Sequence, residues 1–172
     1  MSVLTLAVPA SPANATQSFE ARVAASAASR SAIDDMIMTF GRDSLKPGKY
    51  IWRDAPDAFG EQRVVISLEN QLAFVYRGDT LIAAASISTG EEGRESPAGI
   101  FQVLLKKEMH HSKKYDNAPM PWMQMITDYG VALHAGHNPG HPASHGCIRL
   151  PAAFAKKLYS VTDVGTTVLI GV

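Results

Sequence analysis

Cysteine is the residue type that this sequence has least of. A single cysteine, Cys147, stands among 172 residues, so a disulfide within the chain is excluded. Hydrophobic residues make up 46% of the sequence, which is enough to build the core of one globular domain of ordinary size with a short appendage. The one thiol therefore needs an explanation other than cross-linking.

Net charge and long apolar runs are also missing. Lys and Arg together number 16, as do Asp and Glu, and no dense run of basic residues occurs. Nucleic acids and strongly anionic membrane surfaces both require a basic footprint, so neither is expected as a partner. No stretch approaches the roughly 20 apolar residues that a spanning helix needs, so we expect no stable membrane span.

The first 17 residues permit two interpretations. A short apolar run from Val3 to Val8 is followed by Ala13-Asn14-Ala15, a pattern of small residues that resembles a secretory cleavage site. The basic residues that usually precede such an apolar run are absent. Residues 1–17 are therefore either the remnant of a signal sequence or a disordered tail.

Residues 18–60 are predicted to form a helical appendage and a linker. An amphipathic helix is expected over residues 18 to about 40, where apolar side chains recur at intervals of three, four or six: Phe19, Val23, Ala27, Ile33, Ile37 and Phe40. Gly41 is a natural stop for this helix. Residues 46–56 are punctuated like a linker, although Tyr50, Ile51 and Trp52 could fold back onto the main body.

Short β-rich runs separated by turn residues dominate the chain after Gly60 and predict a mostly antiparallel sheet protein. The runs cover residues 63–68, 72–76, 81–88, 100–105, 123–126, 131–134 and 168–172. A helix is expected from Pro151, in its first turn, to about Tyr159. Residues 109–123, rich in Met, aromatic residues and Pro, form either a lid or wall of a substrate groove or an ordinary connecting loop.

The densest cluster of reactive side chains lies between residues 133 and 149 and comprises His134, His137, His141, His145 and Cys147. His134 ends an apolar run and Cys147 follows Gly146 in a loop, so the two can meet across a turn. A free thiol with a pKa near 8.5 is only a few per cent thiolate at neutral pH, and a neighbouring imidazole raises its nucleophilicity. This pair predicts a Cys147 nucleophile with His134 as general acid and base.

A glycine next to the nucleophile suits acyl transfer. Gly146 lets backbone N–H groups approach a developing oxyanion, and each such donor can be worth roughly 3 kcal/mol. We therefore expect an oxyanion hole formed around Gly146 and Cys147.

The segment Ser144-His145-Gly146-Cys147-Ile148-Arg149, preceded by His134, resembles the signature of YkuD-type L,D-transpeptidases, which crosslink bacterial peptidoglycan. The resemblance covers roughly residues 61–172. It implies a mainly β, β-sandwich-like catalytic domain with one or two short helices, preceded here by the N-terminal helix and linker. It also implies that the protein needs no cofactor and works in the periplasm or at the cell wall.

What the resemblance implies for the reaction is a cysteinyl thioester. Cys147 would attack the carbonyl between a diamino acid and a terminal D-Ala in a stem tetrapeptide, and D-Ala would leave. The acyl group would then pass to an amine of a second stem or of a wall-attached protein. Water as acceptor would instead make the protein an L,D-carboxypeptidase or endopeptidase, and the sequence leaves the acceptor open.

Three more residues of the segment are candidate substrate contacts. The planar guanidinium of Arg149 suits a substrate carboxylate, and the alternative is a salt bridge that fixes the loop. His145 either supports the nucleophile, contacts substrate or packs within the loop. Ser144 either hydrogen-bonds substrate or caps the turn.

Two features of the segment weaken the match with the family. Only nine residues, 135–143, separate His134 from Ser144, fewer than in the commoner family spacing, which puts contacts made by this loop in doubt. His137 and His141 add a rival reading, in which the histidines and Cys147 hold zinc. That reading, or peptidoglycan binding without turnover, would make the protein a non-catalytic module, although the spacing lacks the paired ligands of known zinc motifs.

Overall fold

The structure is a computed structural model that describes residues 16–172. The interpretation of residues 1–17 as a signal remnant or tail therefore lies outside the described residues for its first 15 positions, whereas Thr16 forms a β-bridge with Ile100. Within residues 16–172, no helix is both long and apolar enough to cross a membrane.

The described chain contains two helices and ten strands. The helices are α1 (Phe19–Phe40) and α2 (Ala152–Val161). The strands are β1 (Tyr50–Trp52), β2 (Gln62–Ser67), β3 (Leu72–Arg77), β4 (Thr80–Ser86), β5 (Gly99–Gln102), β6 (Leu105–His111), β7 (Pro119–Met125), β8 (Ala132–Ala135), β9 (Ile148–Leu150) and β10 (Thr167–Gly171).

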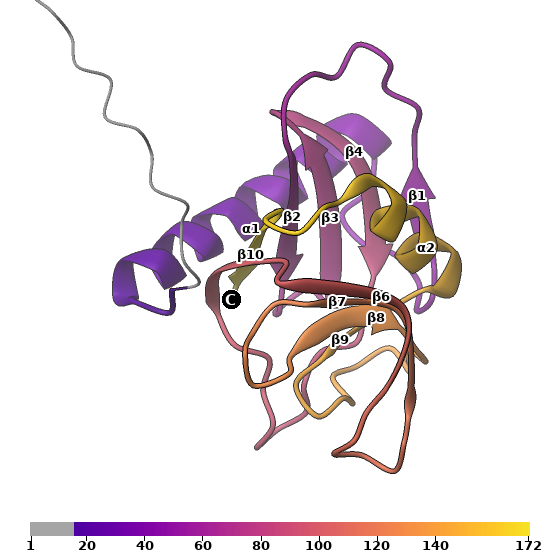
Figure 1. Ribbon diagram of the computed structural model, residues 1–172. Coiled ribbons are helices and arrows are strands. Elements are labelled where there is room, and N and C mark those ends of the chain that lie inside the picture. Colours follow the sequence, from indigo (N-terminus) through magenta and orange to yellow (C-terminus); the bar gives the residue numbers. More distant parts are fainter. Residues whose placement is uncertain (1–15) are drawn as a thin grey trace, which may run out of the picture.

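The strands form two sheets that face each other (Figure 1). Six strands have the order β1-β4-β3-β2-β10-β5, and four have the order β6-β7-β8-β9. Neighbouring strands are antiparallel except for the parallel pairs β10 with β2 and β8 with β9. The mainly β, sandwich-like fold expected from the sequence is confirmed.

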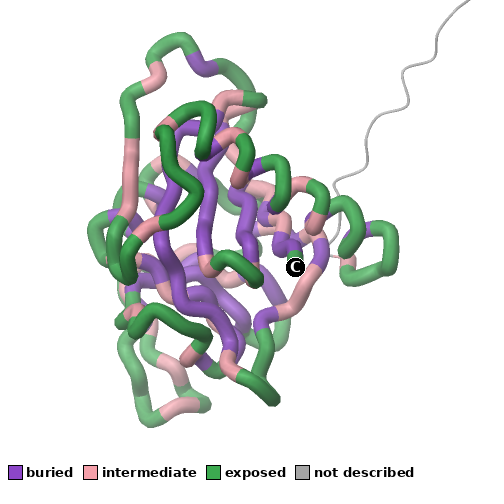
Figure 2. The backbone as a smooth tube through the Cα atoms, turned by 180° about the vertical axis from the view of Figure 1, so that it is seen from behind, coloured by how far each residue is buried: buried purple, intermediate pink, exposed green. Residues whose placement is uncertain are grey.

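The larger core lies between the two sheets and is closed by α2. Side chains from both sheets, such as Ile66, Val75 and Leu133, pack there against Phe154 of α2. Figure 2 shows the buried backbone gathered along the strands, while the connecting loops are exposed. Strand β1 joins this core through the rings of Tyr50 and Trp52, whose centroids lie 5.8 and 5.6 Å from that of Phe154.

The N-terminal helix covers the outer face of the six-stranded sheet (Figure 1). Ser18 caps it by accepting a hydrogen bond from the Ala21 N–H, and Gly41 ends it in the left-handed conformation. The predicted helix and its stop are therefore confirmed. The helix is also joined to the sheet by a hydrogen bond of 2.6 Å, which the Tyr76 hydroxyl of β3 donates to the Asp35 carboxylate of α1.

The apolar stripe predicted for this helix was wrong. Phe19, Val23 and Ile37 are exposed, and the helix instead buries the smaller set Ala21, Ala25, Ser29, Ala32 and Met36. The reason is close approach: a Cβ atom built on Gly171 of β10 would stand 2.4 Å from the Ala25 carbonyl oxygen. Only short side chains fit between backbones that are this close.

Met36 is the one large side chain on the buried face of α1, with no exposed surface. Met36→Ala is expected to lower the free energy of unfolding by roughly 2 to 4 kcal/mol, because it leaves a cavity between the helix and the sheet. Chemical denaturation monitored by circular dichroism measures this. Met38→Ala is the matched control, since Met38 is 78% exposed on the same helix and its loss should change stability by less than about 0.5 kcal/mol. Equal effects of the two substitutions would contradict the packing described.

Most predicted strands occur within a few residues of their expected bounds. Three further strands, β1, β6 and β9, were missed or left open. Strand β1 is the segment that was expected either as linker or to fold back. Strand β6, Leu-Lys-Lys-Glu-Met-His-His, is mostly exposed and lacks alternation, so only its pairing with β7 holds it extended. Residues 109–123 are therefore mainly two paired strands with a turn, and the run expected at 100–105 is divided between β5 and β6. Pro151 precedes α2 as its N-cap, and the helix continues to Val161.

Candidate active site

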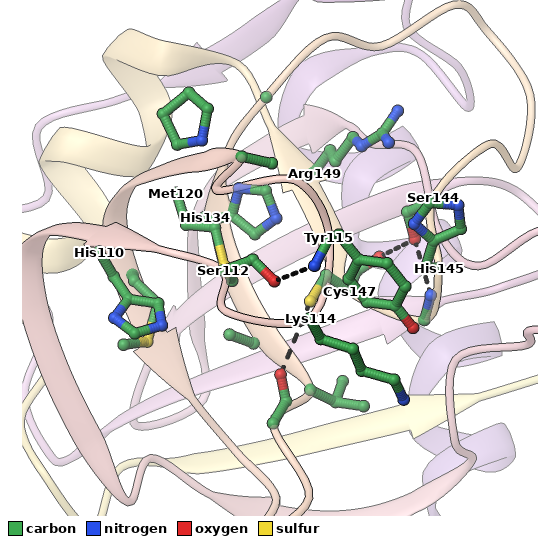
Figure 3. Close-up of a pocket in the computed structure, with 18 of the residues that line it drawn as sticks. His110, Ser112, Lys114, Tyr115, Met120, His134, Ser144, His145, Cys147 and Arg149 are labelled. Atoms are coloured by element: carbon green, nitrogen blue, oxygen red, sulfur yellow. Dashed lines mark hydrogen bonds between the residues drawn. The ribbon is translucent and has the colours of Figure 1, made fainter.

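The parallel pair β8 and β9 brings the candidate nucleophile and base together. Leu133 pairs with Ile148, and His134 pairs with Arg149, so Cys147, which directly precedes β9, lies beside Ala132 at the start of β8. His134, Cys147 and Arg149 all line one cavity of about 1040 Å³ (Figure 3). The nine-residue loop between His134 and Ser144 is therefore long enough to carry the chain back to the start of β8.

His134 is buried, with 8% of its surface exposed, and its Nδ1 lies 2.8 Å from the Ala135 carbonyl oxygen. A carbonyl can only accept, so this hydrogen bond requires the proton on Nδ1 and leaves the Nε2 lone pair free. Burial lowers the pKa of His134, and the Arg149 cation acts in the same direction against the opposing effect of the Ala135 hydrogen bond. The imidazole is therefore held neutral and able to accept a proton.

Cys147 is half-buried, and its thiol donates a weak 3.8 Å hydrogen bond to the Gly130 carbonyl. Burial raises the pKa of the thiol, and the backbone of Ala132 and the Arg149 cation oppose that effect without overcoming it. No hydrogen bond joins Cys147 to His134 within the described residues. The resting pair is thus a neutral thiol and a neutral imidazole.

Four hydrogen bonds made by two buried serine hydroxyls hold the loop that carries Cys147. The buried Ser144 hydroxyl donates to the Cys147 carbonyl and accepts from the Gly146 N–H at 3.1 Å. The buried Ser96 hydroxyl donates to the Gly146 carbonyl at 2.8 Å and accepts from the Gly90 N–H at 3.0 Å. Gly146 itself has φ +113°, a backbone conformation that strains any residue with a side chain.

These contacts also show which backbone donors the loop leaves available. The N–H of Gly146, one of the two expected oxyanion donors, is occupied by Ser144. For the N–H groups of His145 and Cys147, the described residues provide no acceptor. The Ser144 hydroxyl is engaged inside the loop, as its turn-capping interpretation requires.

Arg149 packs its aliphatic stem against Gly136, where an added Cβ would lie 2.9 Å from Arg149 Cγ. Within residues 16–172, no carboxylate lies within 4.0 Å of its guanidinium. Among these residues, Arg149 therefore forms no salt bridge that could fix the loop. The half-buried Arg149 lines the cavity, and its guanidinium lacks an acid partner among these residues.

His145 lies at the rim of the cavity between an aromatic ring and a carboxylate. The Tyr115 ring stacks on it with centroids 4.3 Å apart, and its Nε2 lies 3.9 Å from Glu91 Oε1. Tyr115 belongs to the turn between β6 and β7, so this contact joins the turn to the Cys147 loop (Figure 3). Residues 109–123 thereby form one wall of the cavity.

The remaining two histidines of the cluster do not join a ligand set. His137 and His141 are exposed, and His141 Nδ1 lies 3.0 Å from the Pro142 carbonyl. Across residues 16–172, no group of three or more His, Cys, Asp or Glu side chains is placed to hold a metal ion. The zinc alternative therefore has no geometric support in the described chain.

Several residues that build the site were not identified from the sequence. The carbonyls of Ala135 and Gly130 are backbone groups, which carry no sequence signal. Ser96 was read only as part of a turn, and its contact with Gly146 spans 50 residues of chain. Tyr115 falls in the segment expected as lid or loop, and its position over His145 depends on the register of β6 and β7.

Comparison with known proteins assigns this chain to a family. A family model of the L,D-transpeptidase catalytic domain, named YkuD, matches residues 61–170. No curated protein sequence matches the chain.

Solved structures agree with this match. An L,D-transpeptidase from Stackebrandtia nassauensis is 27% identical, with 69% of this chain and 58% of that chain covered and a TM-score of 0.60. One from Xylanimonas cellulosilytica is 26% identical, with coverages of 69% and 64% and a TM-score of 0.58. L,D-transpeptidase 3 from Mycobacterium tuberculosis, solved with a faropenem-derived adduct, is 20% identical and shows the shared fold alone, with coverages of 65% and 60% and a TM-score of 0.60.

The chain spans less than two thirds of each of these three structures. The family model nevertheless matches more than half of the chain and includes both strands that carry the His134 and Cys147 pair. The chain belongs to the L,D-transpeptidase catalytic domain family.

Proposed function

We propose that this protein is a peptidoglycan L,D-transpeptidase that forms a thioester between Cys147 and a stem tetrapeptide. The single observation that carries the proposal is that His134 and Cys147, brought together by the pairing of β8 and β9, line the same cavity of about 1040 Å³. A cavity of this size accommodates a peptide segment. We further propose residues 61–172 as the catalytic unit, with α1 packing on the outer face of its six-stranded sheet.

The first half-reaction acylates the enzyme. The thiol turns from the Gly130 carbonyl toward His134, and Sγ attacks the carbonyl carbon between the diamino acid and D-Ala while Nε2 takes the thiol proton. The N–H groups of His145 and Cys147 are the proposed donors to the oxyanion, because the Gly146 N–H is already engaged. The C–N bond then breaks, and His134 returns the proton to the leaving amine of D-Ala.

The second half-reaction transfers the acyl group. An amine acceptor attacks the thioester carbonyl and gives a proton to His134, after which the C–S bond breaks and the thiolate regains a proton. We propose that Arg149 holds a carboxylate of the donor, because this residue lines the cavity and its guanidinium has no acid partner among residues 16–172. His145 and Tyr115 would form the rim of the same subsite.

The proposed partners and location follow from this substrate. The donor is a peptidoglycan stem peptide, and the acceptor is a second stem or a wall-attached protein. A protein acting on these substrates works outside the cytoplasm, in the periplasm or at the cell wall.

Product analysis tests the proposal directly. Incubation with a defined tetrapeptide muropeptide is expected to release D-Ala and to yield a crosslinked dimer, both measurable by mass spectrometry. Tripeptide alone, even at high acceptor concentration, would mean that water is the acceptor and that the protein is an L,D-carboxypeptidase. Absence of both products together with absence of any acyl-enzyme would overturn the proposed chemistry.

A further inference from the structure

The cavity wall is cationic although the whole chain is neutral. Arg94, Lys113, Lys114 and Arg149 line the cavity, against a single carboxylate, that of Glu95. Over the full sequence the two signs are equal, at 16 each. The excess of positive charge is therefore concentrated where the substrate would lie.

Pairing within the protein reduces this excess without removing it. Arg94 Nη1 lies 3.3 Å from Glu91 Oε1, so its charge is largely balanced. Within the described part of the chain, Lys113 and Lys114 have no carboxylate within 4.0 Å. Asp116 is in the same turn, but it is exposed and does not line the cavity.

Hydrogen bonds hold the turn that carries the two lysines. Ser112 Oγ accepts from the Tyr115 N–H at 3.2 Å, and the Ala118 N–H donates to the Tyr115 carbonyl at 2.8 Å. Lys114 Nζ stands 5.4 Å from the centre of the Tyr115 ring, which stacks on His145 two residues before Cys147. Figure 3 shows Lys114, Tyr115 and Cys147 among the residues that line the cavity.

We propose that Lys113 and Lys114 bind a carboxylate of the donor stem other than the terminal one, so that the enzyme prefers donors whose internal carboxylates are free over donors in which they are amidated. The inference rests on the proposed function. Arg149 is already proposed for one carboxylate, and a tetrapeptide stem with a γ-linked glutamyl residue and a diamino acid offers further ones. A carboxamide has the same shape and no charge, so it loses the attraction of both ammonium groups.

The experiment compares three donors with the intact chain: the stem with all carboxylates free, the stem amidated at the glutamyl residue, and the stem amidated at the diamino acid. We expect kcat/KM for D-Ala release to be about 3- to 10-fold higher for the free stem than for at least one amidated stem, as exposed charge pairs allow. The amidated stem that shows the loss identifies the carboxylate that is bound.

Charge variants assign the preference to the turn. In the double variant K113Q/K114Q, the ratio of kcat/KM between free and amidated stems should fall toward one. The double variant K46Q/K49Q removes the same charge from exposed lysines away from the cavity and should keep the wild-type ratio.

The possible results separate a failure of the lysine inference from a failure of the proposed function. Equal kcat/KM for all three donors, or an unchanged ratio in K113Q/K114Q, would overturn the inference and leave the proposed function intact. Failure of the wild-type protein to release D-Ala from any donor would overturn the proposed function itself.

Discussion

Replacing Cys147 with Ala is expected to abolish release of D-Ala from tetrapeptide donors, with a loss of roughly 10⁴-fold or more, as removal of a covalent nucleophile produces. The substitution removes only the sulfur of a half-buried side chain, so the protein should remain folded. Cys147→Ser should be nearly as inactive, because a neutral imidazole cannot ionise a hydroxyl as readily as a thiol. Mass spectrometry of products measures both variants, and thermal melting checks their folding.

The same variant gives a second readout through β-lactams. A β-lactam offers a strained carbonyl to the same proposed nucleophile, so we expect it to acylate this protein. The chain has one cysteine, so an adduct seen in the wild-type intact mass and lost in Cys147→Ala assigns the site without peptide mapping. A Cys147→Ala protein that still released D-Ala would place the nucleophile elsewhere and refute the mechanism.

Replacing His134 with Gln is expected to lower kcat/KM for D-Ala release by about 10²- to 10⁴-fold, the range that a positioned general acid and base supplies. Gln is close to His in size, but its amide cannot carry the proton from the thiol to the leaving amine. The matched control is His141→Gln, because His141 is exposed, does not line the cavity and should keep nearly full activity. Steady-state kinetics with a tetrapeptide donor measures both.

The pH profile separates a catalytic role of His134 from a structural one. Its pKa is lowered, so the imidazole stays neutral and able to accept a proton to a lower pH than an ordinary histidine. The acid limb of kcat/KM should therefore lie below the usual titration range of imidazole and disappear in His134→Gln. Because burial raises the thiol pKa, alkylation of free Cys147 by iodoacetamide should keep increasing with pH above the usual thiol range. An acid limb retained unchanged in His134→Gln would assign the titration to another group.

Local sequence patterns predicted the elements whose stability is local. The helix was predicted over residues 18 to about 40 from its apolar periodicity and from Gly41, a stop signal that acts within the last turn. Strands such as β3 and β4 were predicted because their β-branched and apolar runs are buried along their length. The pair of His134 and Cys147 was likewise predicted, since a strand end and a glycine loop only nine residues apart are bound to lie close once the sheet forms.

Tertiary structure decided what depends on partners distant in the chain. Gly171 determines which face of α1 is buried, because backbones in contact exclude the larger side chains that periodicity favoured. The exposed strand β6 exists through its hydrogen bonds to β7, which its own polar sequence does not indicate. Which N–H groups near Cys147 remain free is fixed by the buried Ser144 hydroxyl.

Some properties of the Cys147 thiol were predictable from the sequence, and others depend on the tertiary structure. Sequence alone predicted Cys147 as the candidate nucleophile from its single occurrence and its Ser-His-Gly-Cys setting. Burial, which raises its pKa, and the turn that brings Tyr115 and Lys114 to its cavity arise only when residues 30 positions apart are packed together. Side-chain chemistry is inherent in the sequence, whereas solvation and electrostatic environment are properties of the folded surroundings.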